Sequence, residues 1–266
     1  MYGILITLTV SKGLVMEKYF NINTSGRSIR CKIYCKDLKS VKKAVINIHG
    51  FSGHKDNKAA QRFAEYVLKK RHDTAIIAFN LPCHGDDVRK TILLSDCDLY
   101  IKAVIDYIKS RFSTEDIYVY TTSFGGYLTL KYIAEHGNPF KKIAMRCPAV
   151  NMYEVLSGCI MSPAEQKALS NGKPVLVGFD RKIKIYGDFL DDLKANDITG
   201  YDYTPYSEKL LILHGTKDEV VSFDASEEFA KKNNIEFIPI ENADHRFKDP
   251  NLMNEAIKII FGFLQL

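Results

Sequence analysis

A serine stands at the junction between a short strand and a helix near the middle of this 266-residue chain. Residues 116–121 form a β-branched and aromatic run that predicts a strand, and residues 127–134 have apolar side chains at helical spacing. Between them, Ser123 has Thr121 two positions before it and Gly125 two positions after it. Small residues at these positions are typical of a nucleophile elbow, a turn tight enough to bring strand and helix together. The usual motif is G-x-S-x-G, so Thr121 departs from it.

The elbow matters chemically because it presents the serine hydroxyl at the N-terminus of a helix. Partial positive charge at that end favours a negatively charged oxygen. A short serine motif also occurs in ordinary loops, and serine is a common helix N-cap. Whether Ser123 is a nucleophile therefore depends on finding its partners elsewhere in the chain.

Strands and helices alternate along most of the sequence. A β-hairpin is expected over residues 17–35. Further strands are expected at 44–48, 74–79, 116–121, 142–145, 210–213 and 235–240, and helices at 57–70, 99–112, 127–134, 222–232 and 252–263. This order predicts an α/β fold with a mostly parallel, doubly wound sheet and helices on both faces.

The alternation is interrupted between residues 147 and 207. This stretch contains four prolines and is too long for a plain loop in a compact domain. We therefore predict a single domain over residues 1–266, a length that suits one large core, with 147–207 forming an inserted cap or lid. Aromatic residues of the insertion, such as Tyr153 and Phe179, can line a pocket or form the core of the cap, and the core is favoured for any single one.

The charge pattern argues against a nucleic-acid partner. The 37 basic and 32 acidic residues give a net charge of +5 and are spread along the chain without a block of lysine or arginine. The apolar residues 1–10 are too few to span a bilayer, and they lack the basic start of a signal peptide. No membrane span is expected, and the sequence leaves open whether residues 1–15 are an extended or a disordered leader.

The six cysteines include no C-x-x-C pair, so the common zinc and redox spacings are absent. Cys31 and Cys35 lie in one predicted strand, which separates them by about 13 Å. A disulfide requires Cα atoms within about 7 Å, so this pair cannot bridge. The cysteines are interpreted as buried thiols in a reducing cytosol, and a cytoplasmic location is expected.

Three predicted strands are followed by residues of the kinds found in a catalytic triad. Ser123 follows the strand at 116–121, Asp218 follows the strand at 210–213, and His245 follows the strand at 235–240. Ligands of doubly wound sheets bind at the carboxyl ends of the strands. We therefore expect these three side chains to meet at that edge.

With these motifs in order, the chain resembles an α/β-hydrolase of the esterase, lipase and serine-aminopeptidase type. Within that group it is most similar to small cytosolic carboxylesterases that include feruloyl and cinnamoyl esterases. The resemblance extends from about Lys43 to the C-terminus. It is carried by His49-Gly50-Phe51-Ser52-Gly53, the serine elbow, His214-Gly215-x-x-Asp218 and Asp244-His245.

The resemblance implies a role for each site residue. Ser123 is the expected nucleophile, His245 its general base and acid, and Asp218 the residue that orients the imidazole. The backbone N–H groups of Phe51 and Phe124 are the expected oxyanion hole.

Structural alternatives exist for several of these residues. Asp218 can cap the turn into the following helix, and Glu219 is a neighbouring carboxylate. His49, His214 and His84 are interpreted as structural, hydrogen-bonding histidines. In the resembled family the loop around His84 has a glycine where this chain has Cys83.

The sequence thus predicts hydrolysis of a carboxylic ester with a small aryl or a short-to-medium acyl group. The same triad also serves thioesterases, acyltransferases and peptidases, and a catalytically silent binding protein is a further alternative. No cofactor is expected, because nucleotide-binding glycine motifs are absent. No metal is expected either, the only candidate cluster being residues 84–87. The expected partner is a small-molecule ester, and a homodimer is left open.

Overall fold

Six parallel strands form the centre of the fold. The computed structural model describes residues 7–12, 15–179 and 181–266. In the order in which they lie side by side, the parallel strands are β5 (Thr74–Phe79), β4 (Lys43–Ile48), β6 (Ile117–Thr122), β7 (Ile143–Arg146), β10 (Leu210–Gly215) and β11 (Glu236–Ile240). All six correspond to predicted strands.

Three antiparallel strands extend the sheet beyond β5. They are β1 (Thr7–Lys12), β2 (Val15–Thr24) and β3 (Arg27–Cys35), and β3 pairs with β5. The predicted hairpin is therefore confirmed as β2 and β3. Residues 7–12 of the predicted leader are extended, whereas residues 1–6, 13 and 14 lie outside the described part of the chain.

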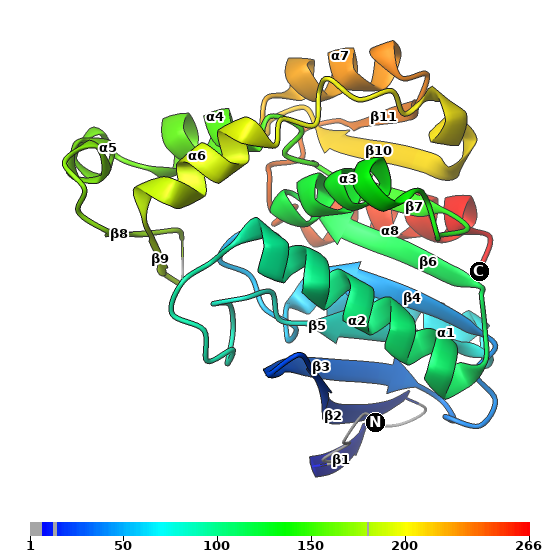
Figure 1. Cartoon of the computed structure of the whole chain (residues 1–266). Coiled ribbons are helices and arrows are strands. Elements are labelled where there is room, and N and C mark those ends of the chain that lie inside the picture. The colour runs from blue at the N-terminus through cyan, green and yellow to red at the C-terminus, as the bar shows by residue number, and fades with distance from the viewer. Residues whose placement is uncertain (1–6, 13–14, 180) are drawn as a thin grey trace.

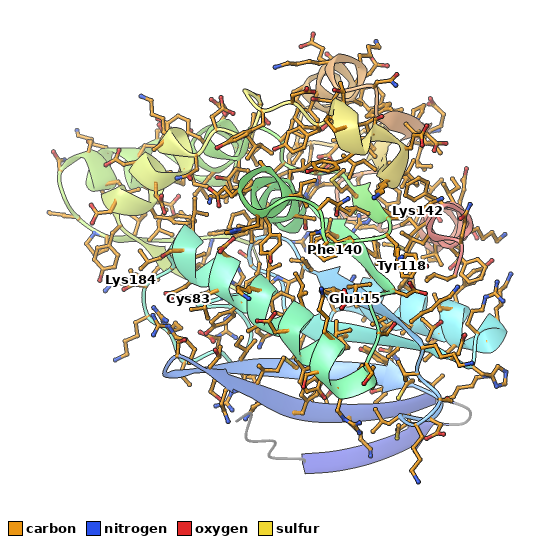
Figure 2. All side chains as sticks on the ribbon, turned by 45° about the vertical axis from the view of Figure 1, so that its right-hand side comes forward. Cys83, Glu115, Tyr118, Phe140, Lys142 and Lys184 are labelled. Carbon is orange, nitrogen blue, oxygen red and sulfur yellow. The ribbon has the colours of Figure 1, made fainter. Side chains whose placement is uncertain are left out.

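Helices cover both faces of the sheet (Figure 1). One face carries α2 (Leu94–Phe112), α3 (Phe124–His136) and α7 (Phe223–Lys232), and the other carries α1 (Lys58–Lys70) and α8 (Pro250–Leu264). Figure 2 shows side chains filling the layers between helices and sheet. The predicted doubly wound α/β-hydrolase fold is confirmed.

A hydrophobic core lies on each face of the sheet, which explains why the central strands are apolar at almost every position. In β4, Ala44, Ile46 and Ile48 pack in the core under α2 and α3, while Val45 packs in the core under α1 and α8. A parallel strand buried on both faces needs apolar side chains in both directions, and so it reads as a continuous run.

Helix α2 begins at Leu94, five residues before the predicted start at residue 99. The first turn contains Asp96, which is buried and looks unsuited to a core helix. Its carboxylate pairs with Arg27 and Arg89, which compensates for its burial. Both arginines lie outside α2, so the pattern of the helix alone did not indicate them.

The interruption between β7 and β10 is an inserted segment, residues 147–209. It contains α4 (Met152–Glu154), η1 (Val155–Ile160), α5 (Pro163–Ser170), the hairpin of β8 (Val175–Val177) and β9 (Ile183–Ile185), α6 (Gly187–Ala195) and η2 (Thr204–Lys209). The hairpin and the helices α4, α5 and α6 project from the end of the sheet toward which the parallel strands point (Figure 1), whereas η2 leads into the start of β10. Leu156 and Phe189 are buried in the same core as α2 and α3, so the segment is packed onto the sheet domain.

All six cysteines are free thiols, and all but Cys159 are buried. Of the helices in the described ranges, none has the length and apolar character required to cross a membrane.

Candidate active site

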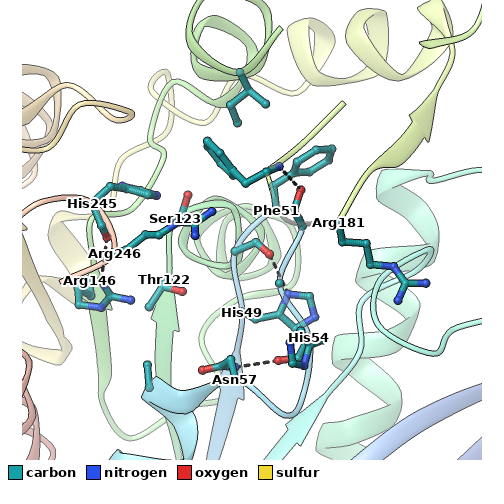
Figure 3. Close-up of a pocket in the computed structure, with 16 residues that line it drawn as sticks. His49, Phe51, His54, Asn57, Thr122, Ser123, Arg146, Arg181, His245 and Arg246 are labelled. Atoms are coloured by element: carbon teal, nitrogen blue, oxygen red, sulfur yellow. Dashed lines mark hydrogen bonds between the residues drawn. The ribbon is translucent and has the colours of Figure 1, made fainter. Parts of the chain in front are cut away.

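A cavity of about 590 Å³ opens at the carboxyl ends of the central strands (Figure 3). Its walls come from the loops after β4, β6 and β11, from the end of β7, and from the inserted segment. Ser123 and His245 both line it. Two of the three predicted triad residues therefore face one cavity, and the third, Asp218, lies directly behind His245.

Ser123 occupies the turn between β6 and α3 in a strained backbone conformation. Its φ of 52° and ψ of −121° are unusual for a residue with a side chain, and such a conformation costs on the order of 1–3 kcal/mol. Hydrogen bonds hold it in place: its N–H donates to the carbonyl of Arg146 (3.1 Å), and its carbonyl accepts from Gly126 (2.8 Å) and Ala149 (3.1 Å). The hydroxyl makes no capping hydrogen bond, which argues against an N-cap role.

The elbow accommodates Thr121 because Gly125 leaves room for it. A Cβ atom on Gly125 would lie 2.5 Å from Thr121 Oγ1 and 2.6 Å from the carbonyl oxygen of Ile48. Instead, Thr121 Oγ1 fills this space and donates to that carbonyl (3.1 Å). Threonine can therefore replace the usual glycine at position 121, because its hydroxyl is hydrogen-bonded to β4.

Asp218 and His245 form a close hydrogen-bonded pair. His245 Nδ1 lies 2.7 Å from Asp218 Oδ2, and the other carboxylate oxygen accepts from the backbone N–H groups of Val220 and Val221, each at 2.8 Å. The Asp218 side chain has no exposed surface. Burial alone would raise the pKa of this carboxyl group, but its hydrogen bonds with His214 and His245 hold the pKa well below its usual range. Glu219 instead accepts from the backbone N–H of His245 (3.3 Å).

His214 is a second imidazole beside the same carboxylate. Its Nε2 lies 3.2 Å from Asp218 Oδ2 and 3.2 Å from the carbonyl oxygen of Val221. Both neighbours are acceptors, so Nε2 carries the proton. The ring is fully buried, which agrees with its interpretation as a structural histidine.

Cys147, His214 and Asp218 place one ligand atom each within 4.8 Å of one another, which raises the question of a metal site. Burial holds the pKa of the Cys147 thiol well above its ordinary value. The carboxylate oxygen is already shared by two imidazoles. The cluster is better described as a hydrogen-bond network behind His245.

The loop after β4 carries the predicted oxyanion donors to the elbow. Phe51 and Phe124 are buried, with their rings edge to face at 5.8 Å. Within the described residues, neither backbone N–H donates to an acceptor. His49 fixes the loop, since its Nδ1 donates to the Gly50 carbonyl (2.8 Å) and its Nε2 accepts from Leu81 N–H (3.2 Å). Burial holds the pKa of His49 well below its ordinary value, so the ring is neutral and structural.

The loop around His84 is also structural. Cys83 has a φ of 68°, a left-handed conformation for which glycine is the usual residue. Its N–H donates to Asp87 Oδ1 (2.9 Å), which stabilises the turn without a glycine. His84 Nδ1 donates to the carbonyl of Pro82 (2.8 Å), and burial lowers the pKa of His84 to about 4.

Arg146 is a site residue that the sequence did not indicate. It ends β7, where it pairs in register with Thr122 of β6. Its Nη1 donates to the carbonyl of His245 (2.9 Å), as Figure 3 shows. A charged residue at the end of an apolar strand was the available signal, but its contact with His245 depends on how β7 and the β11–α8 loop meet.

The inserted segment touches the loop after β4 at the turn between β8 and β9. The N–H of Phe179 donates to Ser52 Oγ (3.3 Å), and Phe179 lines the cavity. Gly178 makes this approach feasible, because a Cβ atom on it would overlap the Ser52 hydroxyl. The insertion thus forms part of the cavity wall.

Comparisons with known proteins agree with this architecture. The structure is similar to Est1E from Butyrivibrio proteoclasticus with ferulic acid bound (TM-score 0.69, 20% identity, 92% of this chain and 99% of that chain covered). It is also similar to alpha/beta hydrolase domain-containing protein 10 from mouse (0.67, 16%, 93% and 98%). A third similar structure is a soluble variant of monoglyceride lipase from Saccharomyces cerevisiae in complex with a substrate analogue (0.69, 13%, 92% and 93%). At these identities the likeness supports the fold alone.

No curated protein matches the chain in sequence. A family model does match it: the model described as the prolyl oligopeptidase family covers residues 94–266, which include the elbow, Asp218 and His245. The chain therefore belongs to the prolyl oligopeptidase family and has the fold of the α/β-hydrolases.

Proposed function

We propose that this protein is a serine hydrolase that cleaves carboxylic esters, with Ser123, His245 and Asp218 as its triad. The observation that carries the proposal is the hydrogen bond between His245 and Asp218 beside Ser123. Ser123 lines the same cavity as His245, has a strained backbone conformation, and makes no capping hydrogen bond with its hydroxyl. A serine hydroxyl is a poor nucleophile unless a base removes its proton. The buried pair supplies such a base.

In the proposed mechanism, Ser123 Oγ attacks the ester carbonyl carbon while His245 Nε2 takes the hydroxyl proton. Asp218 holds Nδ1, so Nε2 is the nitrogen available to the cavity, and the carboxylate stabilises the imidazolium. The C–O bond to the alcohol then breaks, and His245 returns the proton to the departing oxygen. A water molecule, activated by the same histidine, releases the acid from Ser123.

The negative oxygen of the tetrahedral intermediate needs donors. The N–H groups of Phe51 and Phe124 are proposed for this role, which is supported by their lack of other acceptors in the described residues. Removing one such donor typically raises the barrier by about 3 kcal/mol.

Residues 147–207 are proposed as the cap of the single domain. The contact between Phe179 and Ser52 supports this role, because it brings the insertion to the rim of the cavity. Small aryl or short-to-medium acyl esters are the proposed substrates. The ferulic acid bound to the similar Est1E structure motivates the choice of an aryl ester as a probe.

Hydrolysis of a series of 4-nitrophenyl esters of increasing acyl length, together with methyl ferulate, tests the proposal. Wild type is expected to hydrolyse the shorter members, and Ser123→Ala is expected to lose at least about 10³-fold in kcat. Ser170→Ala removes an exposed hydroxyl on α5 and is the matched control. Full activity in Ser123→Ala would contradict the proposal.

A second candidate is a serine peptidase, favoured by the family to which the chain belongs. Release of 4-nitroaniline from a proline anilide distinguishes it from an esterase. Cleavage of the anilide with no turnover of any ester would replace the ester proposal by this one.

A further inference from the structure

Basic groups dominate the charged lining of the active-site cavity. Arg146, Arg181 and Arg246 all line it, and none of the described lining residues is an aspartate or glutamate. Arg246 stacks on Phe179, with its Cζ 5.0 Å from the ring centroid.

Arg146 is a buried guanidinium with no carboxylate partner among the described residues. Only 6% of the residue is exposed. Nη1 donates to the carbonyl of His245 (2.9 Å), Nε lies 3.4 Å from the hydroxyl of Tyr120, and the group stacks on Phe247 at 4.8 Å. All three contacts are with neutral groups. The Asp218 carboxylate, which is bonded to His214 and His245, acts on the guanidinium electrostatically but forms no ion pair with it. A buried charge is normally paired with an opposite charge, because removing it from water is costly.

The strand register brings Arg146 next to the proposed nucleophile. Arg146 pairs with Thr122, and its own carbonyl accepts the N–H of Ser123 (3.1 Å). The backbone of Arg146 is therefore hydrogen-bonded to that of Ser123, and both residues line the same cavity. Nη2 donates to no group in the described part of the chain and is available to a ligand.

Arg181 lies on the opposite side of Ser123 from Arg146, as Figure 3 shows. The acidic residues on that side are Asp56 and Asp86, which line a neighbouring hollow together with Arg181. Lys55 pairs with both carboxylates, at 3.1 Å for Asp56 and 2.6 Å for Asp86, and Lys32 also pairs with Asp56 (3.4 Å). Arg181 is exposed and forms no ion pair within the described residues, so it adds a second positive charge to the cavity lining.

We infer that the substrate is an ester that carries a carboxylate group, held by Arg146 with Arg181 adding to the attraction. This rests on the proposed ester hydrolase function. A guanidinium offers paired N–H donors that match the two oxygens of a carboxylate, and such bonds are stronger inside a cavity than in water. The carboxylate can belong to the acyl part or to the alcohol part of the ester.

Two pairs of esters show which part of the substrate carries the carboxylate. Within each pair, one ester has a carboxylate where the other has a carboxamide. The acyl pair is the 4-nitrophenyl half-ester of adipic acid and its terminal amide. The alcohol pair is 4-carboxyphenyl hexanoate and 4-carbamoylphenyl hexanoate. For at least one pair, wild type is expected to show a kcat/KM at least about tenfold higher for the carboxylate, as fits a charge-assisted hydrogen bond. The pair that shows it identifies the side of the ester that carries the charge.

Variants test the two arginines through the ratio of the two kcat/KM values, which is insensitive to an equal loss on both esters. Arg146→Gln is expected to bring the ratio close to one, and Arg181→Gln is expected to lower it. Arg181→Gln keeps the test valid if Arg146→Gln does not fold. Lys184→Gln removes the same charge from an exposed position of β9 outside the cavity lining and is expected to leave the ratio unchanged.

The outcomes separate this inference from the proposed function. Turnover of the carboxamide esters without preference for either carboxylate overturns the inference and leaves the esterase intact. If no ester is hydrolysed, the esterase proposal fails, and calorimetric titration of the same pairs into Ser123→Ala still tests the charge preference. Tighter binding of a carboxylate than of its amide supports the inference, whereas equal binding overturns it.

Discussion

At the residue scale, the site depends on a few buried or strained residues, each of which is stabilised by specific hydrogen bonds. Ser123 keeps its strained backbone through bonds to β7 and to the segment that follows it, and Thr121 keeps its hydroxyl through a bond to Ile48. Asp218 keeps its charge although its side chain is fully buried, because two imidazoles and two backbone N–H groups surround it. Each contact leads to a measurable effect of substitution.

Asp218 is expected to make the protein sensitive to acid. Its pKa is lowered in the folded state from an ordinary value of 3.8, so its contribution to stability is present above that value and is lost as the pH falls toward the folded pKa. Asp218→Asn removes this titration. Between about pH 5 and 2, wild type is expected to lose about 2 kcal/mol more unfolding free energy than the variant, measured by urea denaturation. Equal losses would contradict this, and Asp188→Asn, at an exposed position of α6, is the control.

Gly125 is expected to tolerate no side chain. The added Cβ of Gly125→Ala would meet Thr121 Oγ1 and the Ile48 carbonyl at 2.5 and 2.6 Å, so the elbow must shift. We expect a loss of about 1–3 kcal/mol in stability and a lower kcat on the ester series. Gly262→Ala in α8 is the matched control, because its Cβ meets open space and alanine favours a helix by about 1 kcal/mol. Gly125→Ala with wild-type stability and kcat would disprove the close packing at the elbow.

At the scale of elements, each strand ends in a loop that brings one component of the site. The sequence could predict this much, because strands buried on both faces are apolar runs and the motifs follow directly after them. In the structure Asp218, and not Glu219, lies beside Nδ1 of His245. The start of α2 was not predicted, since Asp96 depends on partners outside the helix. Arg146 was missed because its function depends on the register of β7 against β6, which periodicity does not report.

From the sequence, the segment between β7 and β10 could be recognised only as a break in the alternation of strands and helices. Its short elements lack a long periodic pattern, and they gain stability by packing on the core that α2 and α3 also share. Among the described residues, its β8–β9 turn makes one hydrogen bond to the loop after β4, from Phe179 to Ser52, beside a glycine with a φ of 125°. Such a contact depends on tertiary structure alone.

Ser52→Ala tests whether that bond fastens the β8–β9 turn. Loss of one hydrogen bond costs about 1 kcal/mol, so amide hydrogen exchange at Phe179 is expected to become about fivefold faster than in wild type. Ser170→Ala on α5 also removes one hydroxyl and is expected to leave this rate unchanged. If exchange at Phe179 does not change in Ser52→Ala, the turn is held by other contacts.

At the scale of the whole molecule, the site exists only when the sheet is complete. Ser123, Asp218 and His245 follow β6, β10 and β11, and β7 lies between β6 and β10. The β10 and β11 strands reach β6 only through β7, which also carries Arg146. The fold therefore joins residues more than a hundred positions apart into one hydrogen-bonded unit.

The most direct test of the proposed triad is the reaction of the folded protein with a serine-directed fluorophosphonate, mapped by mass spectrometry. We expect one adduct, on Ser123, in wild type. We expect none in Ser123→Ala and much slower labelling in His245→Ala, because the hydroxyl then has no base. Equal labelling of wild type and Ser123→Ala, or an adduct on another serine, would contradict the assignment of Ser123 as the nucleophile.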